Sequence, residues 1–335
     1  MASSDNGSLA PLIPRLAQAR VLVIGDLVLD QFIYGLTDRI SREAPVPIVR
    51  ETRRDQRPGG AANVVANLRA LGARTKVLGV VGKDDAGRNL RDLLSHVGVA
   101  TTGLVVSSTR PTEAKTRILA GGLSTTPQQV VRLDQGSHEP LDEKTAAKLV
   151  TALEKALPSV DLVAVSDYGL GTFVPAVVRA VRKAARTKPV VVDSRFDLKR
   201  FGKVTVIKPN APELEAATGR RADDARSAAR AARYLAAELE LEAVLLTRGH
   251  EGLCLAGSRG KATHLPPHGP PEAVDVTGAG DTVLACFCAA LASGASFEDA
   301  ARLANIAGGI VVQKPGTEVA SLAELEAAVR TGGGR

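Results

Sequence analysis

The stretch 274–294, VDVTGAGDTVLACFCAALASG, combines a glycine-rich turn with an acidic residue and a long apolar run. The apolar spacing from Val283 onward predicts a helix. Its N-terminus then falls at the turn made by Gly278, Ala279 and Gly280, where glycine allows a sharp bend and a close approach by a ligand. The free N–H groups of a helix N-terminus, aided by the helix dipole, form an anion site suited to a phosphoryl group.

Asp281 would lie in the first turn of this helix, with its carboxylate beside the anion site. A carboxylate in that place suits the acceptance of a proton from an attacking hydroxyl group during phosphoryl transfer. Aspartate is also a favourable residue in any first helical turn. The segment alone therefore leaves a catalytic and a structural interpretation open.

Small and polar residues also follow the first predicted strand. Asp26 and Asp30 lie beyond it, at the carboxyl edge where open α/β sheets bind ligands. A loop acid that caps a turn is the alternative, and it explains Asp30 better than Asp26. In the segment PGGAANVVANLRALG, Gly59 and Gly60 let a helix start close to a ligand, and Asn63 offers a donor and an acceptor to hydroxyl groups; a tight turn with close helix packing is the alternative.

Two later segments also follow predicted strands. In KPNAPE, Asn210 and Glu213 could reach a hydrated Mg²⁺ ion and phosphates, but the same spacing is typical of a helix N-cap with its box-forming glutamate. Thr247, Gly249 and Gly252 form a glycine-rich turn that suits nucleotide contact and a plain hairpin equally well.

The elements that would position these residues alternate along the chain. Short apolar runs predict buried strands at 21–25, 76–81, 161–166, 189–193, 204–207 and 242–247. Patterns of period 3.6 predict helices at 61–71, 86–97, 142–156, 173–186 and 224–240. This alternation predicts an α/β fold with a mostly parallel sheet covered by helices on both faces.

Segments 31–58 and 112–134 break this rhythm, because apolar and polar residues alternate in them. They predict antiparallel strands with one solvated face, in a small sheet beside the main one; two surface hairpins are the alternative. Residues 1–18 are expected to be a mobile leader, 19–330 a single domain and 331–335 a frayed tail.

Composition excludes several classes of protein. The 335 residues include 43 basic and 36 acidic side chains, so the net charge of +7 is modest and suits an anionic small-molecule substrate. The absence of Trp disfavours nucleic-acid binding. No membrane span, Walker motif or G-x-G-x-x-G fingerprint is present, and the first residues lead us to expect no secretory signal. Three clustered cysteines indicate reduced thiols and a cytoplasmic protein.

These motifs, in this order, resemble the ribokinase-like (PfkB) family of sugar kinases over about residues 20–330. VDVTGAGDT resembles the C-terminal signature of that family, and GGAANVVANLRALG its N-terminal one. GDLVLD, RISREAPVPIV, RPGGAANV, QQVVRLD, SDY and DVTGAGDT together resemble the kinase domain of ADP-heptose synthesis proteins. Members of that group phosphorylate D-glycero-D-manno-heptose 7-phosphate at the anomeric hydroxyl.

The resemblance implies a three-layer α/β/α kinase domain, with segments 31–58 and 112–134 as a β-sheet lid that often mediates dimerisation. It implies that Asp281 is the catalytic base and that the amides from Gly278 to Asp281 form the anion hole. The ATP-binding candidates are Asn210, Ala211, Pro212, Glu213, Thr247, Gly249 and Gly252. The substrate-binding candidates are Asp26, Asp30, Gly59, Gly60, Asn63, Arg57, Lys115, Arg117, Arg132, Asp167, Asp193 and Arg195.

The expected reaction is transfer of the γ-phosphoryl group of ATP to a sugar-phosphate hydroxyl. Mg²⁺ is the expected cofactor, held by Glu213 through water, and K⁺ is a further candidate at Asp275 and Thr277. Basic residues in and near the two lid segments exceed what a neutral sugar requires, although a solvated charged face explains them too. A homodimer formed through the lid is expected.

Two departures from the heptose kinases concern basic residues. Ser194-Arg195-Phe196 stands where that group usually has Pro-Lys-Gly, and Gly169-Leu170-Gly171 stands where it commonly has Ala-Lys-Gly. Arginine presents a planar fork in place of a point charge, so a phosphate would be held differently. A PfkB kinase of another sugar, sugar phosphate or nucleoside is the alternative enzyme. A non-catalytic sugar or nucleotide sensor is the alternative outside enzymes.

Overall fold

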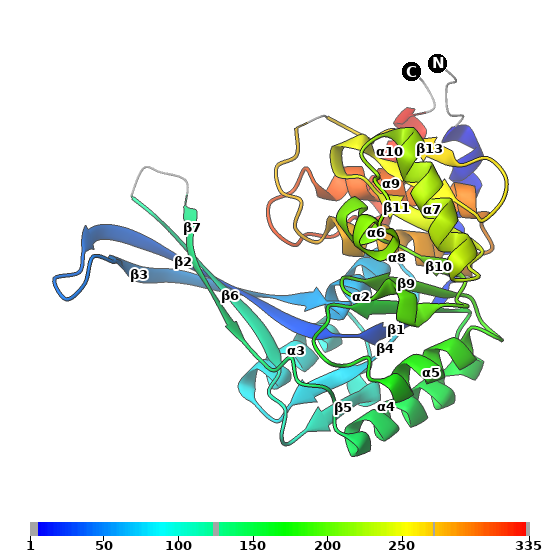
Figure 1. The fold of residues 1–335 in the computed structure, drawn as a ribbon. Helices are drawn as coiled ribbons and strands as arrows, with labels where there is room; N and C mark the ends of the chain where they lie inside the picture. The colour runs from blue at the N-terminus through cyan, green and yellow to red at the C-terminus, as the bar shows by residue number, and fades with distance from the viewer. Residues whose placement is uncertain (1–5, 123–126, 271, 333–335) are drawn as a thin grey trace.

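The computed structural model describes residues 6–122, 127–270 and 272–332. Within them, the chain forms a body built around a nine-stranded sheet and a long arm built from a four-stranded sheet (Figure 1). The strands of the body are β1 (Arg20–Gly25), β4 (Arg74–Gly82), β5 (Leu104–Ser107), β8 (Leu162–Asp167), β9 (Val190–Ser194), β10 (Val206–Ile207), β11 (Ala243–Thr247), β12 (Leu253–Ala256) and β13 (Thr263–Leu265).

The strand order in the body is β13-β12-β11-β10-β9-β8-β1-β4-β5. From β11 to β5 all neighbours pair in parallel, and only β12 and β13 pair antiparallel. The predicted mostly parallel α/β sheet is therefore confirmed. Strands buried on both faces must be apolar throughout, as Val190, Val191 and Val192 of β9 are, each at 0% exposure.

Helices cover both faces of this sheet (Figure 1). They are α1 (Ile13–Leu16), α2 (Ala61–Ala70), α3 (Asp85–His96), α4 (Glu143–Ala156), α5 (Pro175–Ala184), α6 (Ala211–Thr218), α7 (Ala225–Glu238), α8 (Ala279–Ala292), α9 (Phe297–Val311) and α10 (Leu322–Gly332). One core contains residues of α1, α2, α3, α8, α9 and α10, and the other contains residues of α4 to α7. The described residues also form five short 3-10 helices, η1 (Asn6–Leu12), η2 (Thr101–Gly103), η3 (Leu157–Ser159), η4 (Leu198–Phe201) and η5 (Gly249–Glu251).

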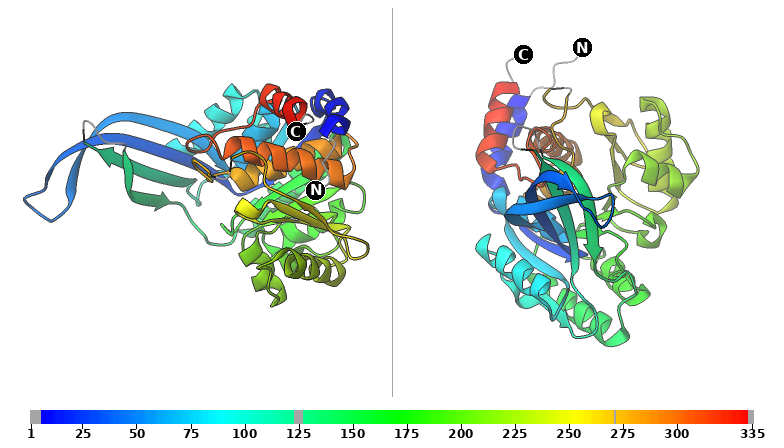
Figure 2. Two further views of the ribbon diagram at one scale, coloured as in Figure 1. Left: turned by 90° about the horizontal axis from the view of Figure 1, so that it is seen from above. Right: turned by 90° about the vertical axis from the view of Figure 1, so that its left-hand side faces the viewer.

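The arm contains β2 (Leu27–Ile40), β3 (Pro47–Gly60), β6 (Glu113–Gly121) and β7 (Gln128–Gln135), in the order β3-β2-β6-β7. We call this sheet the lid; it projects from the body in all three views (Figures 1 and 2). The separate small sheet was predicted, but its central pair, β2 and β6, is parallel and not antiparallel. Alternating polarity reports which faces a strand presents and carries no information on the direction of its neighbour. Residues 123–126 of the predicted segment 112–134 lie outside the described residues.

The prediction of a mobile leader over 1–18 is wrong for the described part, residues 6–18. Helices η1 and α1 lie beside α10 (Figure 2), and Leu9, Ile13 and Leu16 are buried against the body core. Residues 1–5 lie outside the described residues. At the other end, α10 continues to Gly332, so the predicted frayed tail is helical at its start; residues 333–335 lie outside the described residues.

Among the helices of the described residues, none has the length and apolar character that crossing a bilayer requires.

Candidate active site

The carboxyl ends of the central parallel strands meet at one edge of the body sheet. Strands β1, β8, β9, β10 and β11 run parallel to one another, so the residues that follow them share this edge. These are Asp26 after β1, Tyr168 after β8, Arg195 after β9 and Lys208 after β10. The sheet therefore gathers residues that are far apart in the sequence.

A cavity of about 1060 Å³ opens at this edge. It is lined by all the predicted catalytic and ATP-binding residues and by two predicted substrate ligands, namely Gly278, Ala279, Gly280, Asp281, Asn210, Ala211, Pro212, Glu213, Thr247, Gly249, Gly252, Asp193 and Arg195. The cavity is large enough for a nucleotide. Three segments that were proposed separately from the sequence thus line one cavity.

Asp281 occupies the third position of α8 and is 4% exposed. Asn63 Nδ2 donates to its Oδ2 at 2.8 Å, and the Tyr168 hydroxyl donates to its Oδ1 at 2.9 Å. Burial raises the pKa of Asp281 to about 6, and the nearby Asp193 carboxylate adds to the rise, whereas the two donors and the charge of Arg195 oppose it. The carboxylate is held at both oxygens and titrates close to neutral pH, which suits a general base.

The start of α8 requires its glycine. Gly278 has φ +79°, and a Cβ on it would lie 2.7 Å from Asn63 Nδ2. Any larger residue would therefore displace the amide that holds Asp281. The N–H of Ala279 is bonded to the Val276 carbonyl at 3.2 Å, so this member of the predicted anion hole is already occupied. Gly280 and Asp281 lie in the first turn, where a helix offers their N–H groups no internal acceptor.

Lys208 is a functional candidate that the sequence reasoning missed. Its ammonium group pairs with Asp193 Oδ2 at 2.8 Å, and the residue is 3% exposed. A Cβ on Gly280 would lie 3.6 Å from Lys208 Nζ, so the ammonium group is close to the first turn of α8. A buried cation beside free N–H groups strengthens an anion site. The signal was present in the sequence, because Lys208 directly follows a predicted strand.

Asn210 and Glu213 form the capping box of α6. Asn210 Oδ1 accepts the Glu213 N–H and Glu213 Oε2 accepts the Asn210 N–H, both at 2.8 Å. The structural interpretation of this motif is therefore correct, and both residues also line the cavity. Thr247, Gly249 and Gly252 belong to the β11–β12 hairpin, which contributes the neighbouring wall.

Asp26 is buried at the foot of the lid. Its Oδ2 accepts the N–H groups of Tyr168 at 2.7 Å and Leu170 at 3.2 Å, whereas Oδ1 has no hydrogen-bond partner among the described residues. Burial raises the pKa of Asp26. Gly60 has φ +56°, and a Cβ on it would lie 2.5 Å from the Asp26 carbonyl oxygen. A buried oxygen without a partner is costly, so Oδ1 would gain from a further donor; Asp26 is 2% exposed and does not line the large cavity.

Five predicted substrate ligands are engaged in ion pairs within the protein, namely Asp30, Arg57, Arg117, Arg132 and Asp167. Arg117 pairs with Asp30 at 2.5 Å, and Arg57 pairs with Glu318 at 2.6 Å. Arg132 pairs with Asp134 in an exposed part of the lid. Asp167 is bound by Arg200 and by the Ser194 hydroxyl, and it does not line the cavity. Sugar contacts by these residues stay predictions.

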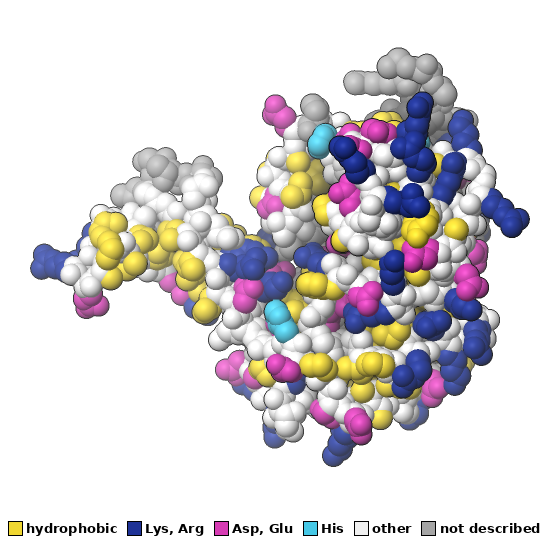
Figure 3. Space-filling view, viewed as in Figure 1, with side chains coloured by type: hydrophobic (Ala, Val, Ile, Leu, Met, Phe, Trp, Pro, Cys, Tyr) yellow, Lys and Arg dark blue, Asp and Glu magenta, His cyan; other side chains and the backbone are white. Residues whose placement is uncertain are grey.

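Two other basic candidates lie beside Tyr168. The Arg195 guanidinium is 3.9 Å and Lys115 Nζ is 5.9 Å from the centre of the Tyr168 ring. Figure 3 shows Lys and Arg side chains where the lid meets the body. The structure thus brings one cation from the lid and one from the body next to the Asp281 hydrogen bond.

The cation candidates Asp275 and Thr277 lie in the loop before α8. The Asp275 carboxylate accepts the N–H groups of Thr277 and Gly316, each at 2.9 Å. Asp275 therefore ties this loop to the segment between α9 and α10. Among the described residues, no cluster of three or more His, Cys, Asp or Glu side chains could hold a metal.

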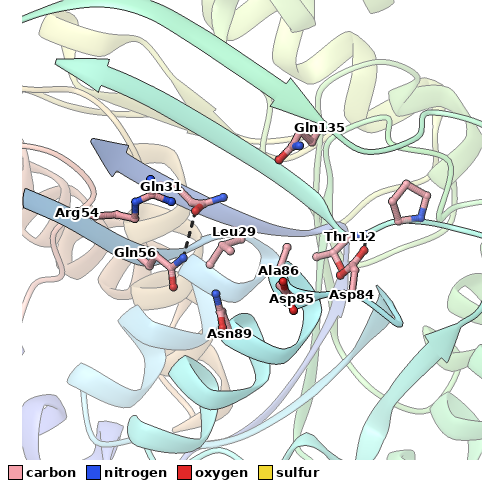
Figure 4. A pocket seen from close by; sticks show the side chains of 11 residues that line it. Leu29, Gln31, Arg54, Gln56, Asp84, Asp85, Ala86, Asn89, Thr112 and Gln135 are labelled. Carbon is pink, nitrogen blue, oxygen red and sulfur yellow. Dashed lines mark hydrogen bonds between the residues drawn. The ribbon is translucent and has the colours of Figure 1, made fainter. Parts of the chain in front are cut away.

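A second cavity of about 490 Å³ lies between the lid and α3, outside the region around Asp281. Figure 4 shows its lining, in which Gln56 Nε2 donates to Gln31 Oε1 at 3.1 Å. Asp84 accepts the N–H of Thr112 at 2.8 Å and so ties the start of β6 to α3. This cavity marks the joint between lid and body.

The profile of the pfkB family of carbohydrate kinases matches residues 18–324. The chain belongs to this family. It is accordingly a phosphotransferase with an alcohol group as acceptor and ATP as co-substrate. The expected pfkB family resemblance is confirmed.

Relatives in the pfkB family include the bifunctional protein HldE of Caulobacter vibrioides, which is 44% identical over 324 residues, covering 96% of this chain and 65% of the relative. HldE of Halorhodospira halophila is 43% identical over 329 residues, covering 97% of this chain and 66% of the relative. The chain thus spans just under two thirds of the length of these relatives.

Solved structures show the same pfkB fold. Arabidopsis thaliana ribokinase in complex with ribose and ATP superposes with a TM-score of 0.70 at 20% identity, covering 95% of this chain and 99% of the ribokinase. Phosphofructokinase-2 from Escherichia coli in complex with substrates and products gives a TM-score of 0.75 at 20% identity, covering 93% and 99%. The predicted ribokinase-like fold is confirmed.

Proposed function

We propose that the chain transfers the γ-phosphoryl group of ATP to the anomeric hydroxyl of D-glycero-D-manno-heptose 7-phosphate, giving the 1,7-bisphosphate for ADP-heptose synthesis. The observation that carries phosphoryl transfer is the buried Asp281 carboxylate beside the first-turn N–H groups of α8 in the large cavity. The choice of heptose rests on the sequence motifs and on the identity with the HldE proteins. ATP use also suits a cytoplasmic location.

In this proposal the sugar lies between the foot of the lid and α8. Asp26 Oδ1 and the Asn63 side chain hold its hydroxyl groups, and Asp281 takes the proton of the attacking hydroxyl. The hydroxyl oxygen forms a bond to the γ-phosphorus as the bond to the bridging oxygen of ADP breaks. The N–H groups of Gly280 and Asp281, with Lys208, face the charge of the transferred group.

Mg²⁺, when bound with ATP, neutralises phosphate charge. Glu213 and Asp193 line the cavity and supply oxygen atoms of the kind that Mg²⁺ takes, directly or through water. Their small number suits an ion that is held mainly by phosphates. K⁺ binding near Asp275 and Thr277 is a separate proposal. Both carboxylate oxygens of Asp275 already accept N–H groups, so a K⁺ ion would have to share these oxygens.

Lys115 and Arg195 are our candidates for the 7-phosphate of the sugar. Their partner at close range is the Tyr168 ring, whereas Arg57, Arg117 and Arg132 already pair with carboxylates. A cation is attracted less strongly by an aromatic ring than by a phosphate group. Both cations are therefore suited to an anionic substrate.

The test is mass-spectrometric detection of a bisphosphate from heptose 7-phosphate and ATP, compared with unphosphorylated heptose and with other sugar phosphates and nucleosides. We expect turnover of the 7-phosphate and little of the neutral sugar. Equal turnover of both would contradict the phosphate clamp. Turnover of a different acceptor alone would replace the heptose and leave the kinase class unchanged, and turnover of none despite ligand-dependent shifts in melting temperature would favour a sensor.

The pH dependence of turnover is expected to follow Asp281. Its pKa of about 6 means that the carboxylate predominates above that pH and is protonated below it. Only the carboxylate accepts a proton, so kcat should rise with pH through about 6 and then level off. The measurement is kcat at saturating substrates from about pH 5 to 9. A flat profile across pH 6 would remove Asp281 as the titrating base.

We propose that two copies of the chain associate through their lids. The exposed apolar side chains of the lid include Val131 at 49% and Leu133 at 55% exposure, on one face of β7, and Figure 3 shows apolar side chains along the arm. Exposed apolar surface of this kind marks an association site. The double variant Val131→Asp/Leu133→Asp is expected to be a monomer by light scattering, and Val106→Asp, which changes an exposed valine on β5 of the body, should remain a dimer. A wild-type monomer, or a dimeric lid variant, would contradict the proposal.

A further inference from the structure

Tyr168 connects two carboxylates at the foot of the lid. Its hydroxyl donates to Asp281 Oδ1 at 2.9 Å, and its backbone N–H donates to Asp26 Oδ2 at 2.7 Å. Asp26 follows β1 and Asp281 belongs to α8, so the two acids come from different elements of the body. One residue thus fixes the distance between the proposed sugar ligand and the proposed base.

The orientation of the Asp281 carboxylate depends on two donors. Asn63 fixes Oδ2, and Tyr168 fixes Oδ1. With only one donor, the carboxylate could rotate about χ2 while it keeps its single hydrogen bond. Rotation of this kind moves the proton-accepting lone pairs away from the reacting hydroxyl, and catalysis is sensitive to such displacements.

The Tyr168 ring is itself held in place. The Arg195 guanidinium lies over the ring at 3.9 Å, and Lys115 Nζ approaches it to 5.9 Å. Such contacts stabilise an aromatic ring by cation–π attraction. Burial, together with the adjacent Asp281 charge, keeps the pKa of Tyr168 well above its ordinary value. The hydroxyl therefore stays protonated and acts as a donor.

We propose that Tyr168 is a positioning residue for phosphoryl transfer, which orients the Asp281 carboxylate through its hydroxyl and ties that orientation to Asp26 through its backbone. This inference rests on the proposed role of Asp281 as the base. It assigns a function to the side chain of a residue that the sequence reasoning left without one.

The test is Tyr168→Phe, which keeps the ring for Arg195 and removes only the hydroxyl. We expect kcat to fall about 10- to 100-fold, with the KM for the sugar changed less than about twofold, since the backbone bond to Asp26 remains. The same change at Tyr234, an exposed tyrosine on α7, should leave both constants unchanged. Wild-type kcat in Tyr168→Phe would overturn the proposal.

The pH profile distinguishes this positioning role of Tyr168 from a merely structural one. The groups that act on Asp281 are Asn63 and Tyr168 as donors and the charges of Asp193 and Arg195, with Lys208 beside Gly280. Loss of the Tyr168 donor removes stabilisation of the carboxylate, so the acid limb of kcat should move to higher pH. A loss of kcat without this movement would assign Tyr168 to folding alone and would also overturn the proposal.

A second readout needs no substrate. The carboxyl carbon of Asp281 is followed by NMR in protein labelled with [¹³Cγ]aspartate, and Asp281→Asn identifies its signal. Its titration midpoint should be near 6 in the wild type and higher in Tyr168→Phe. If heptose 7-phosphate is not turned over but this midpoint moves, the substrate proposal fails and the positioning contact stands. If the midpoint does not move, the positioning contact fails.

Discussion

Replacing Asp281 with asparagine is expected to lower kcat by about 10²- to 10⁴-fold, because the amide cannot accept the proton of the attacking hydroxyl. The fold should be retained, since the new side chain can hydrogen-bond the same two partners. Its carbonyl oxygen can accept from Asn63, and its amide can donate to the Tyr168 oxygen. The measurement is steady-state turnover with ATP and the phosphorylated sugar, alongside thermal unfolding.

The stability of this variant carries a second expectation. Asp281 has a pKa of about 6 in the folded protein against 3.8 for an ordinary aspartate. Its favourable contribution to the free energy of unfolding is therefore complete below about pH 4, and it is lost as the pH rises through about 6. A rise of about two pKa units corresponds to about 3 kcal/mol. Asp281→Asn removes this cost, so above pH 6 it should unfold at the same temperature as the wild type or higher.

Asp299 provides the matched control, because it occupies the same position in the first turn of α9 and does not line the cavity. Asp299→Asn should leave kcat unchanged. Turnover close to that of the wild type in Asp281→Asn would remove Asp281 from the role of base.

Lys208→Met is expected to lower kcat by about 10²- to 10³-fold, since it removes the buried cation beside the first turn of α8. The charge that develops on the transferred group would then face only the N–H groups and bound metal. The variant also leaves the Asp193 carboxylate without its 2.8 Å partner. Some loss of stability is therefore expected.

The double variant Lys208→Met/Asp193→Asn separates these effects, because it has no unpaired carboxylate. It should recover the melting temperature and not the turnover, and Asp193→Asn alone is measured beside it, because Asp193 is also a proposed Mg²⁺ ligand. Lys203→Met is the matched control, since Lys203 forms an exposed ion pair with Glu240, and such pairs contribute little. Recovery of turnover in the double variant would mean that Lys208 acts only through the stability of the fold.

The body of the fold was predictable because its signals are local. Buried strands contain uninterrupted apolar runs, such as residues 190–192 of β9, and the start of α8 is marked by the glycines at 278 and 280. The ordered N-terminal segment also had a signal. Leu9, Leu12, Ile13 and Leu16 have helical spacing, but the prolines between them and the small residues before them favoured a mobile leader.

Individual residues of the site could be predicted from the sequence, whereas most of the contacts between their side chains could not. Asp281 and Asn63 were both selected from the sequence, but their hydrogen bond joins residues 218 positions apart. Tyr168 and Lys208 stand next to motif residues, and only the folded sheet places them at the Asp281 carboxylate and at Gly280. The engagement of Asp167 by Arg200 is likewise a tertiary contact that no spacing reveals.

The lid and the proposed sugar ligands are parts of the same strands. The chain enters β2 one residue after Asp26, and it leaves β3 at Gly60, three residues before Asn63. A tilt of the lid would therefore move Asp26 and Asn63 together. Binding energies are reciprocal. If a contact at the tip favours one tilt of the arm and that tilt changes the affinity for the sugar, the sugar must change the affinity of that contact by the same factor.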